Sequence, residues 1–533
     1  MSDHCDAYTA LSPASLRSEV AEVLQAIADA SASTIIAATA GTELVQLLID
    51  DIVSSSDTST RSRLSREDGL LALQALRTLG SKSTGAKVIG TAANFTKLLS
   101  IYAAYEGTPE ASGTTLRCLA NTLLQVESAR VTFVEEPVAG GHWAVEILKK
   151  SESLDLIFFA ARVLLYAIVS DPADNRAAAD RFVASAIERE EDPPTVVDIL
   201  SQKLDVASAA VLSGAQFGRE ALVDLLKVIG LVIVSYTTTA GETPQDSDPA
   251  WNERLDGLLP ALIRAFHSIP PSTTPLPYTS PLTNAVVALD AVPISPSLKP
   301  IWFPTEGSHG DMLLRAYDVL DATLARYMPG RVEADDPVVE EQCKEVGEPL
   351  NTFATPLVLL ICKLCAADEH SRRRMREWLL PDDLDRSTHL EIRADLLGRL
   401  LRLLVSMTHS LLKQSVGEML FAICEFDGRV LASAVGYGNV AGFLFHKGIS
   451  NTGAQTPTGV DVRPARQTTP DGVPIDPVTG VARDQGPPVD LTEEEREREA
   501  EKLFVLFHRL EQTGAIAPEH NPVRMFREEN HDT

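Results

Sequence analysis

The sequence predicts an all-α protein, and three observations support this fold class. Aromatic residues make up only 5% of the 533 residues, while leucine and alanine recur along the chain, and both are good helix formers and weak strand formers. Apolar residues follow helical spacing, and short breaks rich in glycine, serine, proline or aspartate separate the segments. No alternating, β-branched run with a hairpin turn is found. We therefore expect helices packed on helices.

The helical spacing extends from about Leu16 to Gly448. One stripe has the spacing of a helix with a single buried face and consists of Leu396, Leu397, Leu400, Leu401 and Leu404. Two similar stripes lie upstream and consist of Leu70, Leu71, Leu73 and Leu76, and of Phe158, Phe159, Val163 and Tyr166. Breaks between helices are expected at 107–113, 170–175 and 381–387.

The length of the chain favours a stack of helices over one central core. Single hydrophobic cores stop growing at about 250–300 residues, whereas a solenoid grows by adding helix pairs. No fixed repeat period is visible, but armadillo and HEAT repeats are degenerate in sequence. We therefore predict an armadillo/HEAT-like superhelical solenoid over residues 1–448, with irregular stretches at 237–248 and 267–281.

Three further segments are predicted after the solenoid. Residues 449–491 are rich in Pro, Gly and Thr, which predicts a flexible linker. An amphipathic helix is predicted for residues 492–512, because Thr492 and Glu495 form a capping box at its start. Its apolar face, which needs to pack on the solenoid or on a partner, consists of Leu503, Leu506, Phe507 and Leu510. Residues 513–533 are expected to be a disordered tail.

The charge balance argues against nucleic-acid binding. Acidic residues number 74 and basic residues 47, for a formal net charge of −27, and no dense basic stripe is present. No signal peptide is predicted, and no uninterrupted apolar run is long enough to span a bilayer. The six cysteines are too few and too scattered for a disulfide framework. These features predict a cytoplasmic protein without an integral membrane segment.

No motif for catalysis or for cofactor binding is found. Cys362 and Cys365 have the spacing of a redox or metal pair, but a zinc site needs four ligands and this run supplies two. The segment 436–439 is rich in glycine but lacks a preceding strand and a Lys-Ser/Thr pair, so it is more typical of a helix-ending turn. We therefore expect a non-enzymatic protein that uses neither a metal nor a cofactor.

Two basic clusters stand out against the acidic background. One consists of Arg372, Arg373, Arg374 and Arg376, and the other of Arg77, Lys82 and Lys87. Such runs are often only a solvated helix face. On the inner surface of a solenoid, however, converging guanidinium groups suit an acidic or carboxylate-bearing peptide, because they pair carboxylates bidentately. Both interpretations remain open from the residues alone.

Four segments carry a family resemblance. Residues 435–444 are VGYGNVAGFL, residues 475–480 are IDPVTG, residues 116–121 are LRCLAN, and residues 491–507 begin acidic and end apolar. In this sequence they resemble the YGNAAG segment, the NPVTG segment, the LKCLCN helix and the C-terminal helix of the synembryn family, the proteins named for resistance to inhibitors of cholinesterase. The segment Thr355–Leu380 and the helix at Phe158–Arg162 also fit. The resemblance extends over nearly the whole chain.

The resemblance implies a guanine nucleotide exchange factor and folding chaperone for G protein α subunits (Gα), in their GDP-bound, nucleotide-free or nascent forms. It implies that the concave surface of the solenoid binds the Gα C-terminal helix through Arg77, Asn121, Phe159, Arg162, Arg372 and Arg376. The arginines would pair acidic groups and the terminal carboxylate, and Asn121 would bind the peptide backbone. Phe159 would offer apolar contact, although core packing explains a phenylalanine equally well.

The resemblance further implies that Leu503, Leu506, Phe507 and Leu510 contact the nucleotide-binding domain of Gα. It also implies recruitment through Gα to the inner face of the plasma membrane. The sequence departs from the family pattern at Ser81, where a second basic residue is expected, and Lys82 is the nearest substitute. Residues 451–466 lack the acidic, phosphorylatable stretch of vertebrate relatives. The alternative function is a generic helical adaptor or transport scaffold that binds another acidic peptide.

Overall fold

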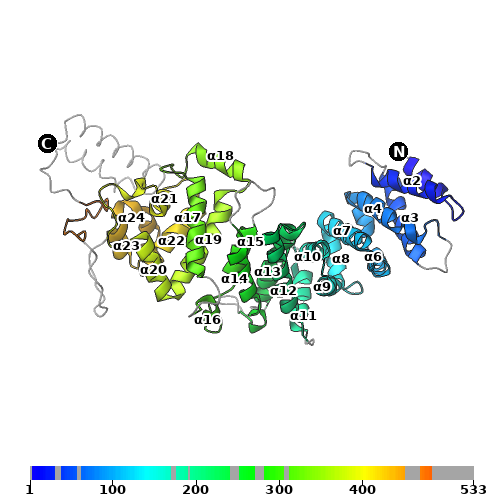
Figure 1. Cartoon of the computed structure of the whole chain (residues 1–533), viewed down its shortest axis with the longest axis horizontal. Helices are drawn as coiled ribbons and strands as arrows, with labels where there is room; N and C mark the ends of the chain where they lie inside the picture. The colour runs from blue at the N-terminus through cyan, green and yellow to red at the C-terminus, as the bar shows by residue number, and fades with distance from the viewer. Residues whose placement is uncertain are drawn as a thin grey trace, which may run out of the picture. The chain divides into compact units, whose positions relative to one another are not determined.

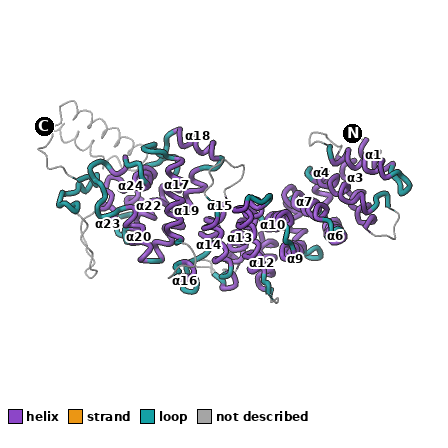
Figure 2. Tube along the Cα trace, in the orientation of Figure 1, coloured by secondary structure: helices purple, strands orange, loops and turns teal. Residues whose placement is uncertain are grey.

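The structure, a computed structural model, describes residues 3–30, 38–56, 62–169, 176–189, 193–239, 251–270, 281–304, 311–449 and 468–482. These residues form α-helices joined by short turns (Figure 1), and the described part contains no β-strand (Figure 2). The predicted all-α class is therefore confirmed. The helices are α1 (Asp3–Ala10), α2 (Arg17–Ala28), α3 (Ala38–Ser56), α4 (Gly69–Gly80), α5 (Ser83–Ile89), α6 (Ala92–Ala104), α7 (Pro109–Gln125), α8 (Glu127–Val134), α9 (Gly140–Lys150), α10 (Leu154–Ile168), α11 (Arg176–Glu188), α12 (Val196–Ser213), α13 (Gly218–Thr239), α14 (Leu258–Ser268), α15 (Pro281–Asp290), α16 (Lys299–Trp302), α17 (Met312–Tyr327), α18 (Pro337–Val346), α19 (Leu350–Ala367), α20 (Glu369–Leu379), α21 (Leu396–Leu404), α22 (Ser410–Ile423), α23 (Gly428–Val435) and α24 (Tyr437–His446).

Local sequence signals set the ends of these helices. The hydroxyl of Thr195 accepts from the backbone N–H of Asp198 and so caps α12 at its start, and Gly214 ends that helix in the left-handed conformation with φ 69°. Asp395 caps α21 in the same way. The predicted leucine stripe of α21 is buried along its whole length. Caps, rather than a repeat motif, thus divide the chain into helices.

One row of helices runs through the molecule. In chain order, α4, α7, α10, α13, α15, α19 and α22 each pack on the next, while helices such as α12, α14 and α17 form a second layer against them. Each helix therefore buries its apolar face mainly on sequence neighbours, as in a solenoid of stacked repeats. This arrangement confirms the predicted armadillo/HEAT-like architecture.

Two helices of the row are long and apolar enough to cross a membrane by length and composition. They are Gly218–Thr238 within α13 and Leu350–Ala367, which is α19. Burial among the other helices accounts for their composition, because 67% and 56% of the two windows are buried. Core helices of a large helical stack share this property with membrane spans.

The structure differs from the sequence-based boundaries at the N-terminal end. Residues 3–10 form helix α1, although they look polar, because Tyr8 and Leu11 are buried against the next helices. Cys5 is buried as well, and three buried positions are too few to give a clear period. The break expected at 107–113 is also shorter, since α7 begins at Pro109, where a proline is well suited to the first turn.

A short segment inside the predicted linker packs on the last helices. Residues 477–481, which we call the strap, belong to the same unit as the helical stack. The backbone N–H groups of Tyr437 and Gly438 donate to the carbonyls of Pro477 and Val478 at 2.9 and 2.8 Å. These are N–H groups of the first turn of α24, which have no partner within their own helix. The linker is therefore not free along its whole length.

The remaining described residues of this region, 468–476 and 482, belong to a second unit. There the backbone N–H of Thr469 donates to the carbonyl of Val473 at 2.8 Å, and Gly472 has φ 81°. Several predicted features lie outside the described residues, namely most of the irregular stretches at 237–248 and 267–281, the remaining linker, the helix at 492–512 with its capping box, and the tail at 513–533.

Candidate functional site

Four of the six groove residues predicted from the sequence line one cavity. Its volume is about 310 Å³, and its lining consists of Arg77, Arg117, Ala120, Asn121, Phe158, Phe159, Arg162 and Phe217. Arg77, Asn121, Phe159 and Arg162 were predicted. The residues come from α4, α7 and α10, which are consecutive helices of the row, and from the turn before α13, the next helix of the row. The cavity therefore lies on the continuous row of the stack.

Helical geometry explains how residues so far apart in sequence meet here. On α7, Arg117 and Asn121 are four residues apart and so lie on one face. On α10, Phe158 and Arg162 have the same spacing. Packing of α7 on both α4 and α10 then brings Arg77 to the same cavity.

Three phenylalanines form the apolar part of the cavity. The rings of Phe158 and Phe159 lie with centroids 4.6 Å apart, and the ring of Phe217 stacks on that of Phe158 at 5.6 Å with planes 15° apart. Phe158 and Phe159 are only 4% and 6% exposed. Phe159 therefore packs in the core and also lines the cavity, and its contact with a partner stays a prediction.

Two guanidinium groups cover the buried rings. Arg117 lies over the ring of Phe159 at 4.3 Å and Arg162 over that of Phe158 at 4.2 Å. Partly desolvated cation–π contacts of this kind stabilise the cation where it stands. Burial, with a smaller effect of the positive charge of Arg77, lowers the pKa of Arg117. A ligand that brings negative charge would relieve this unfavourable electrostatic environment.

Arg162 also forms an ion pair with a buried acidic residue. Its Nε donates to Oδ2 of Asp224 on α13 at 2.8 Å, and the Asp224 side chain is 5% exposed. Burial raises the pKa of Asp224, and the charge and hydrogen bond of Arg162 oppose that rise. The contact uses one edge of the guanidinium group and leaves its terminal amino groups for a ligand.

The other polar side chains of the cavity have no hydrogen-bonding or ion-pair partner in the described part of the chain. The side chains of Arg77, Arg117 and Asn121 make no hydrogen bond and no ion pair with any described residue. They therefore present donors, and in Asn121 also an acceptor, to whatever occupies the cavity. An anion beside an apolar group matches this lining.

The two remaining predicted residues lie elsewhere. Arg372 and Arg376 are on α20, one turn apart, and neither lines the cavity. Arg376 is 3.7 Å from the carboxylate of Glu425. Arg374, in contrast, pairs with Asp311 and lies over the ring of Trp378 at 4.8 Å. The basic cluster of α20 thus divides into a structural arginine and residues that remain half-buried or exposed on the helix surface.

Sequence reasoning missed Arg117, Phe158 and Phe217. Ser81 and Lys82, considered for the second basic position, do not line the cavity, and Arg117 brings the second charge instead. Arg117 is in the same LRCLAN segment as Asn121 and four residues before it, so helical spacing could have found it. Phe217 follows a turn and has no periodic signal.

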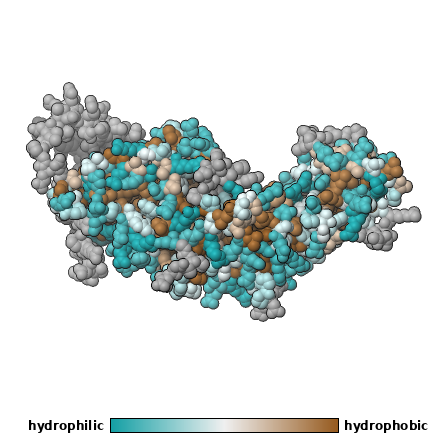
Figure 3. All heavy atoms as spheres, viewed as in Figure 1, coloured by the Kyte–Doolittle hydropathy of each residue, from teal (hydrophilic) through white to brown (hydrophobic). Residues whose placement is uncertain are grey.

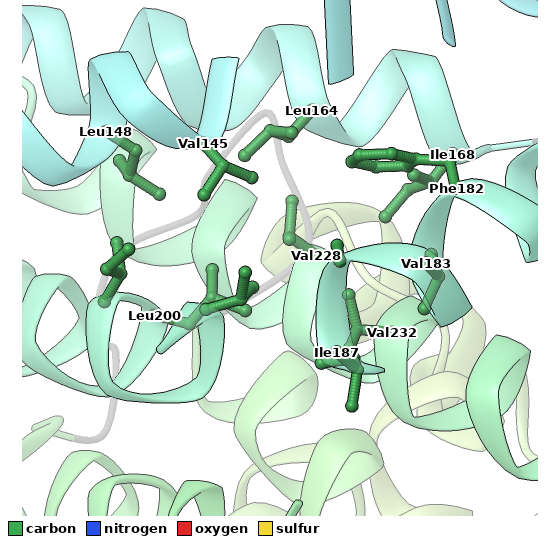
Figure 4. A pocket seen from close by; sticks show the side chains of 13 residues that line it. Val145, Leu148, Leu164, Ile168, Phe182, Val183, Ile187, Leu200, Val228 and Val232 are labelled. Carbon is green, nitrogen blue, oxygen red and sulfur yellow. The ribbon is translucent and has the colours of Figure 1, made fainter. Parts of the chain in front are cut away.

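A second, smaller cavity is apolar throughout. It has a volume of about 20 Å³ and lies among α9, α10, α11, α12 and α13, and all thirteen side chains in Figure 4 are hydrocarbon. This volume is at the lower limit for one water, and no polar group is present to bind it. The cavity is therefore a packing defect of the core, not a ligand site.

The described residues contain no group of three or more side chains suited to holding a metal ion. All six cysteines are free thiols. Burial raises the pKa of Cys362 to about 11 and that of Cys365 to about 12, so neither is a thiolate at neutral pH. Cys365 is buried in α19 and packs as a small apolar residue.

The described residues thus form a helical-repeat protein with a cavity lined by arginines, an asparagine and phenylalanines. The chain belongs to the family described as the guanine nucleotide exchange factor synembryn (Ric8), whose family model matches residues 72–531. The matched range includes every cavity residue and the strap.

Curated relatives carry chaperone names. The chain is 30% identical over 181 residues to Chaperone Ric-8A of Xenopus tropicalis, and this covers 32% of each protein. It is 28% identical over 225 residues to Chaperone Ric-8A of Gallus gallus, covering 39% of this chain and 41% of the relative. It is 29% identical over 182 residues to Chaperone Ric-8 of Drosophila pseudoobscura pseudoobscura, covering 33% and 32%. The chain thus spans about a third of the length of these relatives.

Proposed function

We propose that this protein is a guanine nucleotide exchange factor and folding chaperone for Gα, and that it binds the C-terminal helix of Gα. The observation that carries the proposal is the cavity at which Arg77, Arg117, Arg162 and Asn121 meet three phenylalanines. A chain terminus has the matching chemistry, because its carboxylate accepts bidentate hydrogen bonds from guanidinium groups.

The row of helices offers an apolar surface beyond the cavity. Four helices of the row carry exposed aliphatic side chains, which are Leu124 (48% exposed), Val234 (45%), Val287 (48%) and Leu359 (43%). Leu124 lies on the same face of α7 as Asn121, one turn further on. Figure 3 shows hydrophobic side chains at the surface over α10 and α13. An amphipathic helix that ends in the cavity would cover such residues.

The proposed mechanism is a shift in population. If the protein binds the Gα C-terminal helix only when that helix is detached from the nucleotide-binding sheet, it favours the open, nucleotide-poor form. GTP then favours the closed form and releases the partner. Binding of the same helix also stabilises a newly made Gα before it has bound nucleotide. No covalent chemistry is required, so no catalytic residue is assigned.

The rest of the proposal concerns residues and locations beyond the cavity. Arg372 and Arg376 on α20 are proposed to pair acidic groups of Gα. Leu503, Leu506, Phe507 and Leu510 are proposed to contact the nucleotide-binding domain. We place the protein in the cytoplasm, recruited through Gα to the inner face of the plasma membrane.

GDP release from purified Gα, with and without this protein, tests the proposal. We expect faster release that disappears when Gα lacks its last few residues. Complex formation with newly translated Gα, without faster release, would leave the chaperone function alone. Failure of both would contradict the assignment and favour an adaptor for another peptide.

Charge-reversal variants test which arginines contribute to the binding of Gα. Arg77→Glu is expected to weaken binding to Gα by about tenfold to a hundredfold, the value of one or two charge-assisted hydrogen bonds. Its stability should not change, because Arg77 has no hydrogen bond or ion pair to lose within the described residues. The double variant Arg372→Glu/Arg376→Glu should also abolish binding with an intact helical circular-dichroism signal. Arg181→Glu, at an exposed pair with Glu135, is the matched control.

A further inference from the structure

Phe217 combines a strained backbone with a half-open side chain. Its φ is 64°, in the left-handed region that side-chain-bearing residues rarely adopt. It is the residue before α13, and its carbonyl accepts from the N–H of Ala221 at 2.9 Å. Strain of this kind persists where the surrounding structure imposes it, and it concentrates at functional sites.

The turn between α12 and α13 imposes the conformation. Four residues join the two helices, and Gly214, the first of them, is also left-handed with φ 69°. A Cβ on Gly218 would lie 2.8 Å from Cβ of Ala210, so the start of α13 is pressed against the end of α12. A glycine at position 217 would satisfy this backbone without strain, yet the chain has a phenylalanine there.

The ring of Phe217 is the apolar surface of the cavity that remains accessible to a ligand. The rings of Phe158 and Phe159 are nearly fully buried, and guanidinium groups lie over both. No described cation lies over the ring of Phe217, which lines the same cavity and is only half-buried. An apolar group entering the cavity therefore meets Phe217 while the carboxylate beside it meets the arginines.

We propose that Phe217 is a specificity-determining residue, which selects partner tails whose last side chain, next to the free carboxylate, is bulky and apolar. This inference rests on the proposed function, because it assigns the apolar half of the same site. The ring lines the cavity from this strained turn and also stacks on the ring of Phe158.

The test uses the full chain and short synthetic peptides that end in Leu or in Ala, each with a free carboxylate. The unchanged protein is expected to prefer the Leu peptide by about tenfold, the effect of burying one aliphatic side chain. Phe217→Gly should lose this preference and keep its affinity for the Ala peptide. Its melting temperature should change little, because the backbone strain that glycine relieves offsets the ring contacts with Phe158 and Phe159 that it removes. Phe217→Asn, a residue that tolerates the left-handed region, should behave in the same way.

Phe426 supplies a matched control. It has φ 58°, is 47% exposed and packs its ring on Phe421 at 5.8 Å, but it does not line the cavity. Phe426→Gly should keep the preference for Leu.

Two results would overturn the inference while the proposed function stands. The protein could accelerate GDP release and bind both peptides equally, or Phe217→Gly and Phe217→Asn could keep the preference. Unfolding of both variants would also overturn it, because the ring would then serve the fold. A folded protein that binds neither peptide nor intact Gα would instead contradict the proposed function itself.

Discussion

At the scale of single residues, two arginines of this molecule, Arg402 and Arg372, differ in burial and in hydrogen bonding. Arg402 is 2% exposed, and its guanidinium donates to the carbonyls of Gly330, Val332 and Arg393 at 3.1, 3.0 and 2.9 Å. The side chain of Arg372 makes no hydrogen bond with any described residue. The first arginine holds a loop to α21, and the second is available to a partner.

This contrast predicts opposite effects of removing the charge. Arg402→Met should destabilise the protein by about 3–5 kcal/mol, because it leaves several carbonyls without donors in a buried place. Arg372→Met should change stability by less than about 0.5 kcal/mol. Urea unfolding followed by circular dichroism measures both. Equal effects would show that Arg372 has a structural role.

The same contrast shows what sequence reasoning reaches at this scale. Resemblance and spacing led to Arg77, Asn121, Phe159 and Arg162, which the structure places around one cavity. Neither the resemblance nor the spacing could distinguish Arg374, which pairs with Asp311, from the other arginines of α20. Partners distant in sequence decide which arginine is structural, and one sequence does not reveal them.

At the scale of elements, the strap explains why two distant glycines are needed. Gly436 and Gly480 have φ 85° and 72°. A Cβ on Gly436 would lie 2.6 Å from the backbone N of Gly480, and one on Gly480 would lie 2.9 Å from the carbonyl of Val435. Arg386 adds hydrogen bonds to the carbonyls of Gly480 and Ala434 at 2.8 and 2.7 Å. The two motifs that carry the family resemblance in this region therefore meet in one contact.

Gly480→Ala should release the strap, because the new methyl group meets backbone atoms that cannot move aside. We expect faster hydrogen exchange at the amides of Tyr437 and Gly438, which donate to the strap. Gly448→Ala is the matched control, since Gly448 shares a positive φ of 70° but has open space where a Cβ would lie. Unchanged exchange in Gly480→Ala would show that the strap contributes nothing to the order of α24.

A second long-range contact, made by the side chain of Asp335, predicts that the stability of the protein depends on pH. Burial alone would raise the pKa of Asp335, but hydrogen bonds from Ser406, Thr408 and the backbone N–H of Met407 outweigh it and hold the pKa at about 2. The unfolded value is higher, about 3.9, so the stabilisation is fully present above about pH 4 and is lost as pH falls toward 2.

The expected loss on acidification is about 1 kcal/mol, because Asp335 is exposed and solvent screens much of the effect. Unfolding in urea at pH 5 and pH 2.5 measures it. In Asp335→Asn this part of the pH dependence should be absent. A variant with the same slope as the unchanged protein would place the titration on another carboxylate.

At the scale of the whole stack, stability should be local. Each helix of the row packs mainly on its neighbours in the row, so the buried core continues from helix to helix along the stack and has no common centre. The free energy of such a stack is approximately a sum of repeat and nearest-neighbour contributions. The sequence predicted this architecture from length and helical spacing. It could not give the order of contacts along the row, because degenerate repeats carry no visible period.

Local stability has a direct test in hydrogen exchange. Phe95 on α6 is fully buried and packs edge-on against Phe133 on α8, with ring centroids 5.1 Å apart. Phe95→Ala should cost about 3–5 kcal/mol, and exchange should accelerate in α6, α7 and α8 while α21 and α22 keep their protection. The reciprocal variant Leu400→Ala, at a buried position of α21, should leave α6 to α8 protected. Uniform acceleration in either variant would mean that the stack unfolds as one cooperative unit. In that case binding at the cavity would stabilise every helix equally, whereas a locally stable stack confines that stabilisation to the helices around α7 and α10.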